Sequence, residues 1–121
     1  TVFELSDNYL AKNSKKVSRI LNENNYNSDD CILILRTILN KSKRLLKLKN
    51  EIDKNNNIDL VLSSFKPPIF WKEKEVVKKQ LQLSSIEEIK KIIYKINDLE
   101  LLVKKNSLNS FNFVADFVRN Y

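Results

Sequence analysis

The sequence contains no glycine and no histidine, and these two absences exclude whole classes of function. P-loops and dinucleotide-binding fingerprints need glycines where the backbone approaches the phosphates, so neither motif is possible. Histidine is the usual general base and the most common metal ligand, so most acid–base centres and zinc sites are excluded as well. We therefore expect no cofactor, no metal and no catalysis by this chain.

Cysteine and methionine are nearly absent too. Cys31 is the only cysteine, and one thiol forms neither an internal disulfide nor a zinc site; its apolar neighbours (CILIL) favour a buried structural thiol. No apolar stretch approaches the ~20 residues of a membrane span, and no signal peptide is visible, so we expect a protein of the reducing cytoplasm. Methionine is missing even at position 1, which predicts that the chain is a piece of a longer protein.

What the chain does have is an excess of lysine, asparagine and isoleucine, and a formal net charge of +7 over 121 residues. This length suits a single domain, which buries roughly two-thirds of its unfolded surface. Apolar residues make up 42% of the chain, enough to build a core. The positive charge is consistent with an acidic partner, either nucleic acid or protein, and equally with a solvated lysine surface.

Apolar residues recur with helical spacing almost throughout, and no run alternates with a period of two. This pattern predicts an all-α fold, with residues 1–121 forming one domain of about seven helices. The expected helices are Val2–Lys12, one capped by Ser14, a long one capped by Ser28 and ending at Asn55–Asn57, Ile58–Phe65, residues 68–83, one capped by Ser85 and ending at Lys104–Lys105, and a last one around residues 111–118.

Asparagine is expected to take over the role of glycine at helix ends. It is the residue best able to adopt the left-handed conformation that closes a helix when no glycine is present. The segment Asn55–Asn57 is one such end, and Asn25, Asn50 and Asn106 are expected to occupy comparable positions.

Residues 65–74, FKPPIFWKEK, contain both prolines and the only tryptophan of the chain. A proline moves the residue before it out of the α conformation, so Pro67 and Pro68 predict a rigid corner between two helices. Proline also suits the first position of a helix, which predicts that the next helix begins at Pro68.

On a helical wheel of residues 68–83, Phe70 falls on the apolar arc with Val77, whereas Trp71 points into a sector that carries lysines. An exposed indole among lysines suits a surface that stacks on an unpaired base and attracts phosphates. The competing interpretation is that Trp71 folds back over Phe65 of the preceding helix. The candidate contacts for DNA or a partner are Phe70, Trp71, Lys72, Lys74 and Lys78.

A second basic group lies in the C-terminal half of the long third helix. Cations suit the negative end of a helix dipole, which accounts for them without any ligand. The alternative interpretation is that these cations form a basic patch that contacts DNA. Its members are Lys41, Lys43, Arg44 and Lys47.

Four stretches resemble, in order and spacing, the C-terminal domain of the delta subunit of bacterial DNA polymerase III, the clamp-opening member of the clamp loader. The corner, residues 65–74, is similar to a corner of that domain with two prolines, an apolar residue, two aromatics and a basic residue. The other stretches resemble the family's late acidic helix, its long basic third helix and the start of its collar domain. They are residues 98–104 (DLELLVK), 35–36 (LR) with 44–46 (RLL), and 3–7 (FELSD).

The resemblance implies a helical, collar-like domain, by which five clamp-loader subunits hold one another in the ring that places the sliding clamp on primed DNA during replication. It implies AAA+-like modules before residue 1, through which alone the sliding clamp would be bound. The implied partners are the other loader subunits and primer-template DNA, which the corner approaches. The subunit does not hydrolyse ATP, although it belongs to a DNA-directed DNA polymerase holoenzyme.

Two other functions stay open. A stand-alone basic helical protein that binds nucleic acid outside any ring would account for the charge and for Trp71 equally well. An enzyme would need acids that converge across a cleft. The adjacent carboxylates Asp29–Asp30 and Glu87–Glu88 each fall in the first turn of an expected helix, where capping and dipole effects of ~0.3–1 kcal/mol apiece explain them.

Overall fold

The computed structural model describes residues 1–121 and confirms the all-α prediction. Seven α-helices and two short 3₁₀ turns follow one another, without a strand. They are α1 (Val2–Leu10), α2 (Ser14–Glu23), α3 (Ser28–Asn55), α4 (Ile58–Ser64), the 3₁₀ turn η1 (Trp71–Glu73), α5 (Lys74–Leu83), α6 (Ile86–Lys105), the 3₁₀ turn η2 (Ser107–Asn109) and α7 (Ser110–Arg119). None of the helices combines the length and the apolar character that crossing a membrane requires.

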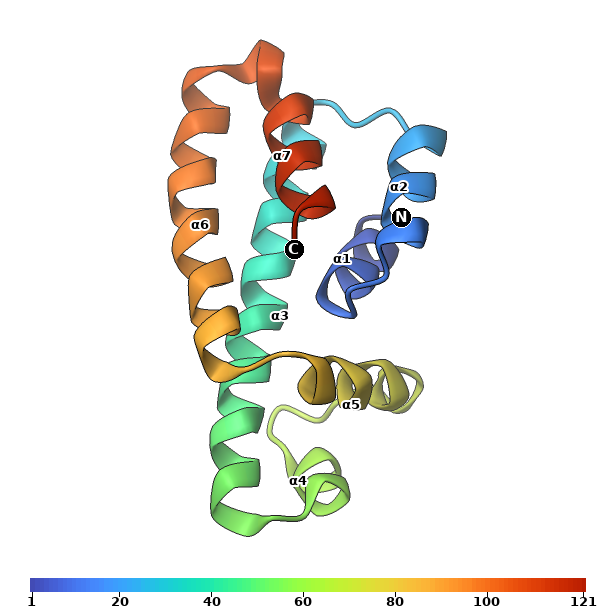
Figure 1. The fold of residues 1–121 in the computed structure, drawn as a ribbon, viewed down its shortest axis with the longest axis vertical. Helices are drawn as coiled ribbons and strands as arrows, with labels where there is room; N and C mark the ends of the chain where they lie inside the picture. The colour runs from blue at the N-terminus through green and yellow to red at the C-terminus, as the bar shows by residue number, and fades with distance from the viewer.

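The longest helix, α3, spans 28 residues and runs the length of the molecule (Figure 1). It contacts α1, α4, α5, α6 and α7, whereas α2 packs against α1 and α7. Helix α6 returns antiparallel along the first part of α3, and α4 and α5 lie across its C-terminal part (Figure 1). The fold is therefore a bundle built around one central helix.

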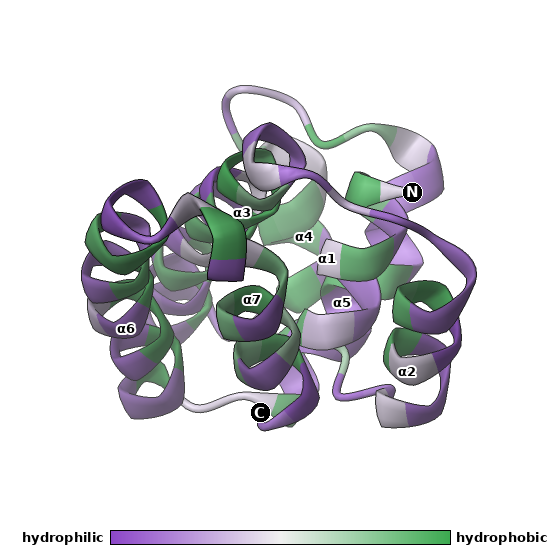
Figure 2. Ribbon diagram, turned by 90° about the horizontal axis from the view of Figure 1, so that it is seen from above, coloured by the Kyte–Doolittle hydropathy of each residue, from purple (hydrophilic) through white to green (hydrophobic).

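The apolar stripe of α3 is the centre of the core, as predicted. Cys31, Leu35, Ile38, Leu45 and Leu48 are all buried, and they belong to one cluster of 25 buried apolar residues that draws on every α-helix. Figure 2 shows the hydrophobic positions of the helices turned toward the middle of the bundle and the hydrophilic ones turned outward. Burial, with a smaller effect of the Asp30 carboxylate, raises the pKa of the Cys31 thiol to about 11.

Two N-caps lie one residue earlier than predicted. Asn27 caps α3, with its side-chain oxygen accepting the Asp30 N–H at 2.8 Å while the Asp30 carboxylate accepts the Asn27 N–H at 3.1 Å. Asn13, whose side chain accepts the N–H of Lys16 at 3.4 Å, caps α2. Asparagine is as good an N-cap as serine, so the first of two adjacent capping residues takes the position in each case. The caps expected at Ser14 and Ser28 are therefore wrong.

The cap predicted at Ser85 is confirmed, and it is part of a capping box at the start of α6. The Ser85 hydroxyl accepts the Glu88 N–H at 3.1 Å, and the Glu88 carboxylate accepts the Ser85 N–H at 3.0 Å. The Lys12 ammonium also donates to Glu88 at 2.9 Å. The backbone N–H of Ser85, followed by Lys12, holds the pKa of Glu88 below its usual value.

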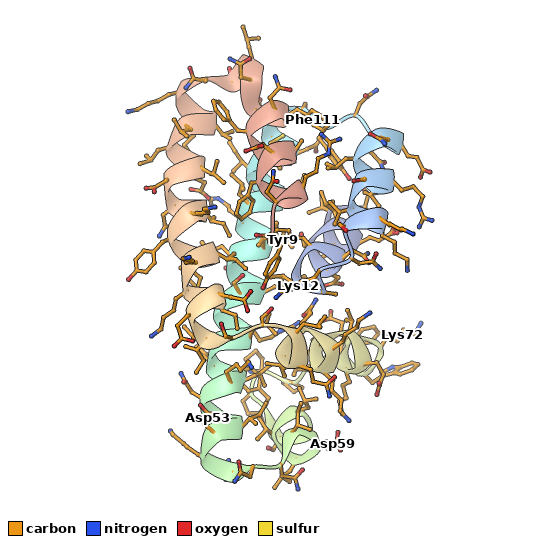
Figure 3. All side chains as sticks on the ribbon, in the orientation of Figure 1. Tyr9, Lys12, Asp53, Asp59, Lys72 and Phe111 are labelled. Carbon is orange, nitrogen blue, oxygen red and sulfur yellow. The ribbon has the colours of Figure 1, made fainter.

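The C-terminus packs against the end of α1 beside this capping box. The ring of Tyr121 packs at 5.0 Å from that of Tyr9 on α1, and the Lys12 ammonium lies 4.7 Å above the Tyr121 ring. Figure 3 labels Tyr9 and Lys12 close together at this place. Burial, followed by the nearby Tyr121, raises the pKa of Tyr9. The contacts tie α1 to the C-terminus and, through Lys12, to α6.

Asn56 ends α3 in the left-handed conformation, with φ 52° and ψ 22°, and its N–H donates to the Ile52 carbonyl at 2.7 Å. The prediction for this asparagine end is confirmed. The prediction for Asn50 is wrong, because the apolar stripe of α3 continues to Ile52 and carries the helix past it. Asn106 ends α6 with a negative φ, and Asn25 follows the end of α2 without a left-handed φ.

Replacing Asn56 tests the left-handed helix end. Asn56→Ala is expected to lower the free energy of unfolding by about 1 kcal/mol, because a Cβ without a polar group disfavours this conformation. Asn56→Gly is expected to be neutral or stabilising. Urea unfolding followed by circular dichroism measures both, and Asn50→Ala inside α3 is the matched control, expected to stabilise by a few tenths of a kcal/mol. An equal loss of free energy of unfolding in Asn56→Ala and Asn50→Ala would contradict a left-handed helix end at Asn56.

Candidate interaction surface

The predicted corner between α4 and α5 is present. We call residues 65–70 the corner segment; they have no helical structure, and their Lys66–Pro67 peptide bond is cis. Phe65, the C-cap of α4, is already extended with φ −62° and ψ 141°. Ile69 is buried, with 6% of its surface exposed, and anchors the segment in the core.

The prediction that the next helix begins at Pro68 is wrong. Phe70 is extended, with φ −57° and ψ 131°, and its carbonyl accepts the N–H of Glu73 at 2.8 Å, which starts η1. The α-helix itself begins only at Lys74. In an extended segment successive side chains point to opposite sides, so once Ile69 faces the core Phe70 faces away from it.

The expected core position of Phe70 is wrong for the same reason, since a helical wheel does not apply to the corner segment. Phe70 is 55% exposed and Trp71 is 69% exposed. Their ring centroids lie 6.0 Å apart at an angle of 56°, and the Lys72 ammonium lies 5.4 Å from the Trp71 ring. Trp71 thus pairs with Phe70 and does not cover Phe65. Figure 3 places Lys72 at the outer end of α5, away from α6.

The other two lysines of the candidate contact set have different surroundings. Lys78 donates to the Asp59 carboxylate of α4 at 3.2 Å, so it links α4 to α5. The Asp59 side chain is 77% exposed, which makes this a surface pair of small energetic value. Lys74 is half-buried and forms no ion pair. Lys72 and Lys74 are therefore the cations near Trp71 that no carboxylate neutralises.

The candidate basic patch of α3 divides in two. Lys41 is buried and its ammonium lies 3.0 Å from the Asp7 carboxylate of α1. Arg44 is half-buried and its guanidinium lies 3.0 Å from the Glu73 carboxylate of η1. These two cations hold neighbouring elements against α3. Lys43 and Lys47 are exposed and form no ion pair, so they remain free for a ligand.

A groove of about 660 Å³ runs along this side of α3. We call it the α3 groove. Its lining brings all four residues of the predicted basic patch together with the corner segment and with an exposed phenylalanine of α1. The lining residues are Phe3, Leu33, Thr37, Asn40, Lys41, Lys43, Arg44, Lys47, Phe65, Lys66, Pro67 and Glu73.

Phe3, Leu33 and Lys66 are among the lining residues of the α3 groove that sequence reasoning missed. They come from three segments that are distant in sequence and meet only in the fold. One signal was present, because Leu33 lies on the same face of α3 as Arg44 and Lys47, at spacings of 11 and 14 residues. An exposed leucine in line with cations indicates a second, ligand-facing stripe on a helix whose other stripe is buried.

Sequence reasoning also missed the outer face of α6. Tyr94 is 73% exposed and Leu101, seven residues later on the same face, is 59% exposed. Leu108 in the following turn η2 is 99% exposed. The inner stripe of α6 is buried at Ile89, Ile92, Ile96 and Val103. Helix α6 is therefore apolar on its core side and partly apolar on its solvent side.

The adjacent carboxylates have structural roles. Asp30 and Glu88 each close a capping box, and Asp29 and Glu87 are exposed in the same first turns. No group of three or more histidine, cysteine, aspartate or glutamate residues lies close enough together to hold a metal ion. The arrangement of the molecule offers surfaces for binding, where cations and exposed apolar groups lie together.

The exposure of Trp71 is measurable because it is the only tryptophan of the chain. We expect emission close to that of solvent-exposed indole and efficient quenching by iodide and by acrylamide. Lys72→Glu is expected to reduce quenching by the iodide anion but not by neutral acrylamide, because local positive charge concentrates anions. Lys91→Glu on α6 is the control and leaves both unchanged. Blue-shifted emission with weak quenching would show that Trp71 is covered.

No family model, no curated protein and no solved structure matches this chain. No relative therefore exists in these comparisons from which a function can be transferred. The function has to be inferred from the residues of the chain and from their contacts.

Proposed function

We propose that this chain is the C-terminal assembly domain of a DNA polymerase III delta subunit. In this role it holds the subunit in the clamp-loader ring that places the sliding clamp on primed DNA. Its partners are the other loader subunits, through its helix faces, and primer-template DNA, through the corner. The sliding clamp is bound by modules that precede this domain in the full subunit.

One observation carries the proposal: ion pairs from α3 link the four stretches on which the family resemblance rests. Two of the α3 cations, Arg36 and Arg44, themselves belong to these stretches, and so do all three carboxylates. Each pair places a charged residue of a matched stretch at a contact with α3, as residues that maintain a shared fold would be. The pairs are Asp7–Lys41 at 3.0 Å, Glu73–Arg44 at 3.0 Å and Glu100–Arg36 at 3.3 Å.

The exposed apolar residues of α6 support the assembly role. Exposed large apolar side chains on one helix face are candidate contacts for another protein. Tyr94 and Leu101 lie above one another on the outer face of α6, with Leu108 beyond its C-terminal end. A helix that is apolar on its core side and partly apolar on its solvent side suits a domain that is packed against neighbours in a ring.

The corner supports contact with DNA in the same complex. Phe70 and Trp71 are exposed beside Lys72 and Lys74, which have no carboxylate partner. Aromatic side chains stack on unpaired bases and contribute ~1–3 kcal/mol per base, while cations attract the phosphates. These residues also suit the second candidate function, a stand-alone basic protein that binds nucleic acid outside any ring.

One experiment distinguishes the assembly domain from the stand-alone nucleic-acid-binding protein. The chain is mixed with the other loader subunits, and the mass of the eluting complex is measured. We expect the chain to elute with the loader subunits. Leu101→Asp is expected to weaken this association at least about tenfold, because it places a charge in an apolar contact. Leu60→Asp on α4 is the matched control, since Leu60 is 58% exposed and Leu101 is 59% exposed. A chain that binds DNA but elutes alone would favour the second candidate.

The corner predicts how the chain binds a primer-template junction. Binding is expected to weaken as salt rises, because counterions are released from the phosphates. Trp71→Ala is expected to cost about 1–3 kcal/mol of binding. The double variant Lys72→Glu with Lys74→Glu is expected to reduce DNA-stimulated clamp loading more than assembly of the ring.

Fluorescence anisotropy with a labelled primer-template measures these DNA affinities. The matched control reverses Lys90 and Lys91 on α6, which are also exposed, and is expected to leave the Trp71-dependent part of the binding unchanged. Affinity that stays constant between low and moderate salt would argue against DNA contact. A Trp71→Ala variant that is less stable but binds DNA with unchanged affinity would also argue against DNA contact.

A further inference from the structure

The α3 groove carries exposed apolar side chains along its length and unpaired cations toward one end. Toward the N-terminal end of α3 it is lined by Leu33 and Phe3, which are 52% and 67% exposed. Toward the C-terminal end it is lined by Lys43, Lys47 and, from the corner segment, Lys66. Phe65 and Pro67 line the same end as Lys66, and the Lys41 ammonium lies 5.5 Å from the Phe3 ring. The two ends therefore differ in their unpaired cations rather than in their apolar surface.

The cations of the groove are only partly neutralised. Asp7 pairs with Lys41, and Glu73 pairs with Arg44. The remaining cations, Lys43, Lys47 and Lys66, are exposed and form no ion pair. In addition, the buried Nε–H of Arg44 has no hydrogen-bond acceptor. A buried donor without an acceptor is costly, so a small shift of the Arg44 side chain that brought this N–H to an anionic oxygen in the groove would be favourable.

The size of the groove limits its ligand. The floor from Leu33 to Lys47 covers 14 helical steps, roughly 21 Å at 1.5 Å per residue. An extended peptide of about six residues has this length at ~3.3 Å per residue. The volume of about 660 Å³ is that of a site for a short segment and is far too small for a duplex.

We propose that the α3 groove binds an acidic peptide segment that carries a bulky apolar side chain at one end. The apolar side chain packs between Phe3 and Leu33. The carboxylates reach Lys43, Lys47 and Lys66, and one of them accepts the free Nε–H of Arg44. This inference goes beyond the proposed function, because the proposed DNA contacts Phe70, Trp71, Lys72 and Lys74 do not line the groove and because it does not depend on assembly into a ring.

The arrangement favours a peptide over single-stranded nucleic acid. In a nucleic acid, charge and base alternate at every nucleotide, so both cationic and aromatic groups are needed along the whole track. In the α3 groove the free cations gather at one end. The Glu73 carboxylate also lines the groove, where it would repel a phosphate chain. A peptide with separate apolar and acidic parts matches this distribution.

The test uses fluorescence anisotropy of the full chain with a labelled peptide of the sequence FLSEEEE and with its reverse, EEEESLF. We expect the anisotropy of at least one of these two peptides to reach saturation as protein is added. A peptide of the same composition with alternating apolar and acidic residues, and a labelled oligothymidine of similar length, are measured alongside and are expected to bind more weakly. Circular dichroism of each protein variant confirms that it remains folded.

Two groove variants and one matched control locate the binding. The triple variant K43E/K47E/K66E is expected to weaken peptide binding at least about tenfold, because it reverses the complementary charge. Phe3→Ser is expected to weaken it about threefold or more, because it removes one wall of the apolar end. The control K90E/K91E/K95E makes the same change of net charge at exposed positions of α6 and is expected to keep the affinity.

Several outcomes would overturn the proposal. Equal loss in the control would show attraction by net charge alone, and failure of both peptides to saturate would show that the groove has no such ligand. Tighter binding of oligothymidine that depends on the groove lysines would assign the groove to nucleic acid. Elution of the same variants with the loader subunits is recorded separately, so a failure here is distinguishable from a failure of the proposed function.

Discussion

The structure depends on the burial of the apolar side of α3. Five other helices pack against this one helix, and its side chains at Ile34, Leu35, Ile38 and Leu48 have no exposed surface. A helix of 28 residues with such a stripe is not stable alone in water, because most of the stability of a protein helix comes from packing of its apolar face. Each neighbouring helix is therefore positioned by the part of α3 that it covers.

Ion pairs from α3 fix how the neighbouring elements are aligned along this helix. Arg36, Lys41 and Arg44 of α3 each reach a carboxylate on a different element, namely Glu100, Asp7 and Glu73. Exposed pairs of this kind contribute little, at a median of ~0–1 kcal/mol. Loss of one partner of a buried pair is much more costly, since a buried charge is left alone. Lys41, the most buried of the three, fixes where α1 lies along α3.

Much of the fold could be predicted from the sequence because helical periodicity is a local signal. The stripes of α3, α6 and α7 and the capping box at Ser85 needed no knowledge of the tertiary structure. The start of α5 could not be predicted without the tertiary structure, because two prolines are compatible both with a helix start and with an extended segment. Burial of Ile69 decides between them, and this depends on residues far away in the chain. The α3 groove could not be predicted as a whole for the same reason.

The anchoring of the corner segment has a consequence for the energetics of recognition. Ile69 fixes the segment from below, and the Glu73–Arg44 pair fixes the turn that follows. Phe70 and Trp71 project from a backbone that is already ordered before any ligand arrives. Ordering a free loop costs ~1–2 kcal/mol per residue in backbone entropy, and this cost is avoided here. The aromatic pair is preorganised, so less of its contact energy is lost to ordering the chain when a ligand binds.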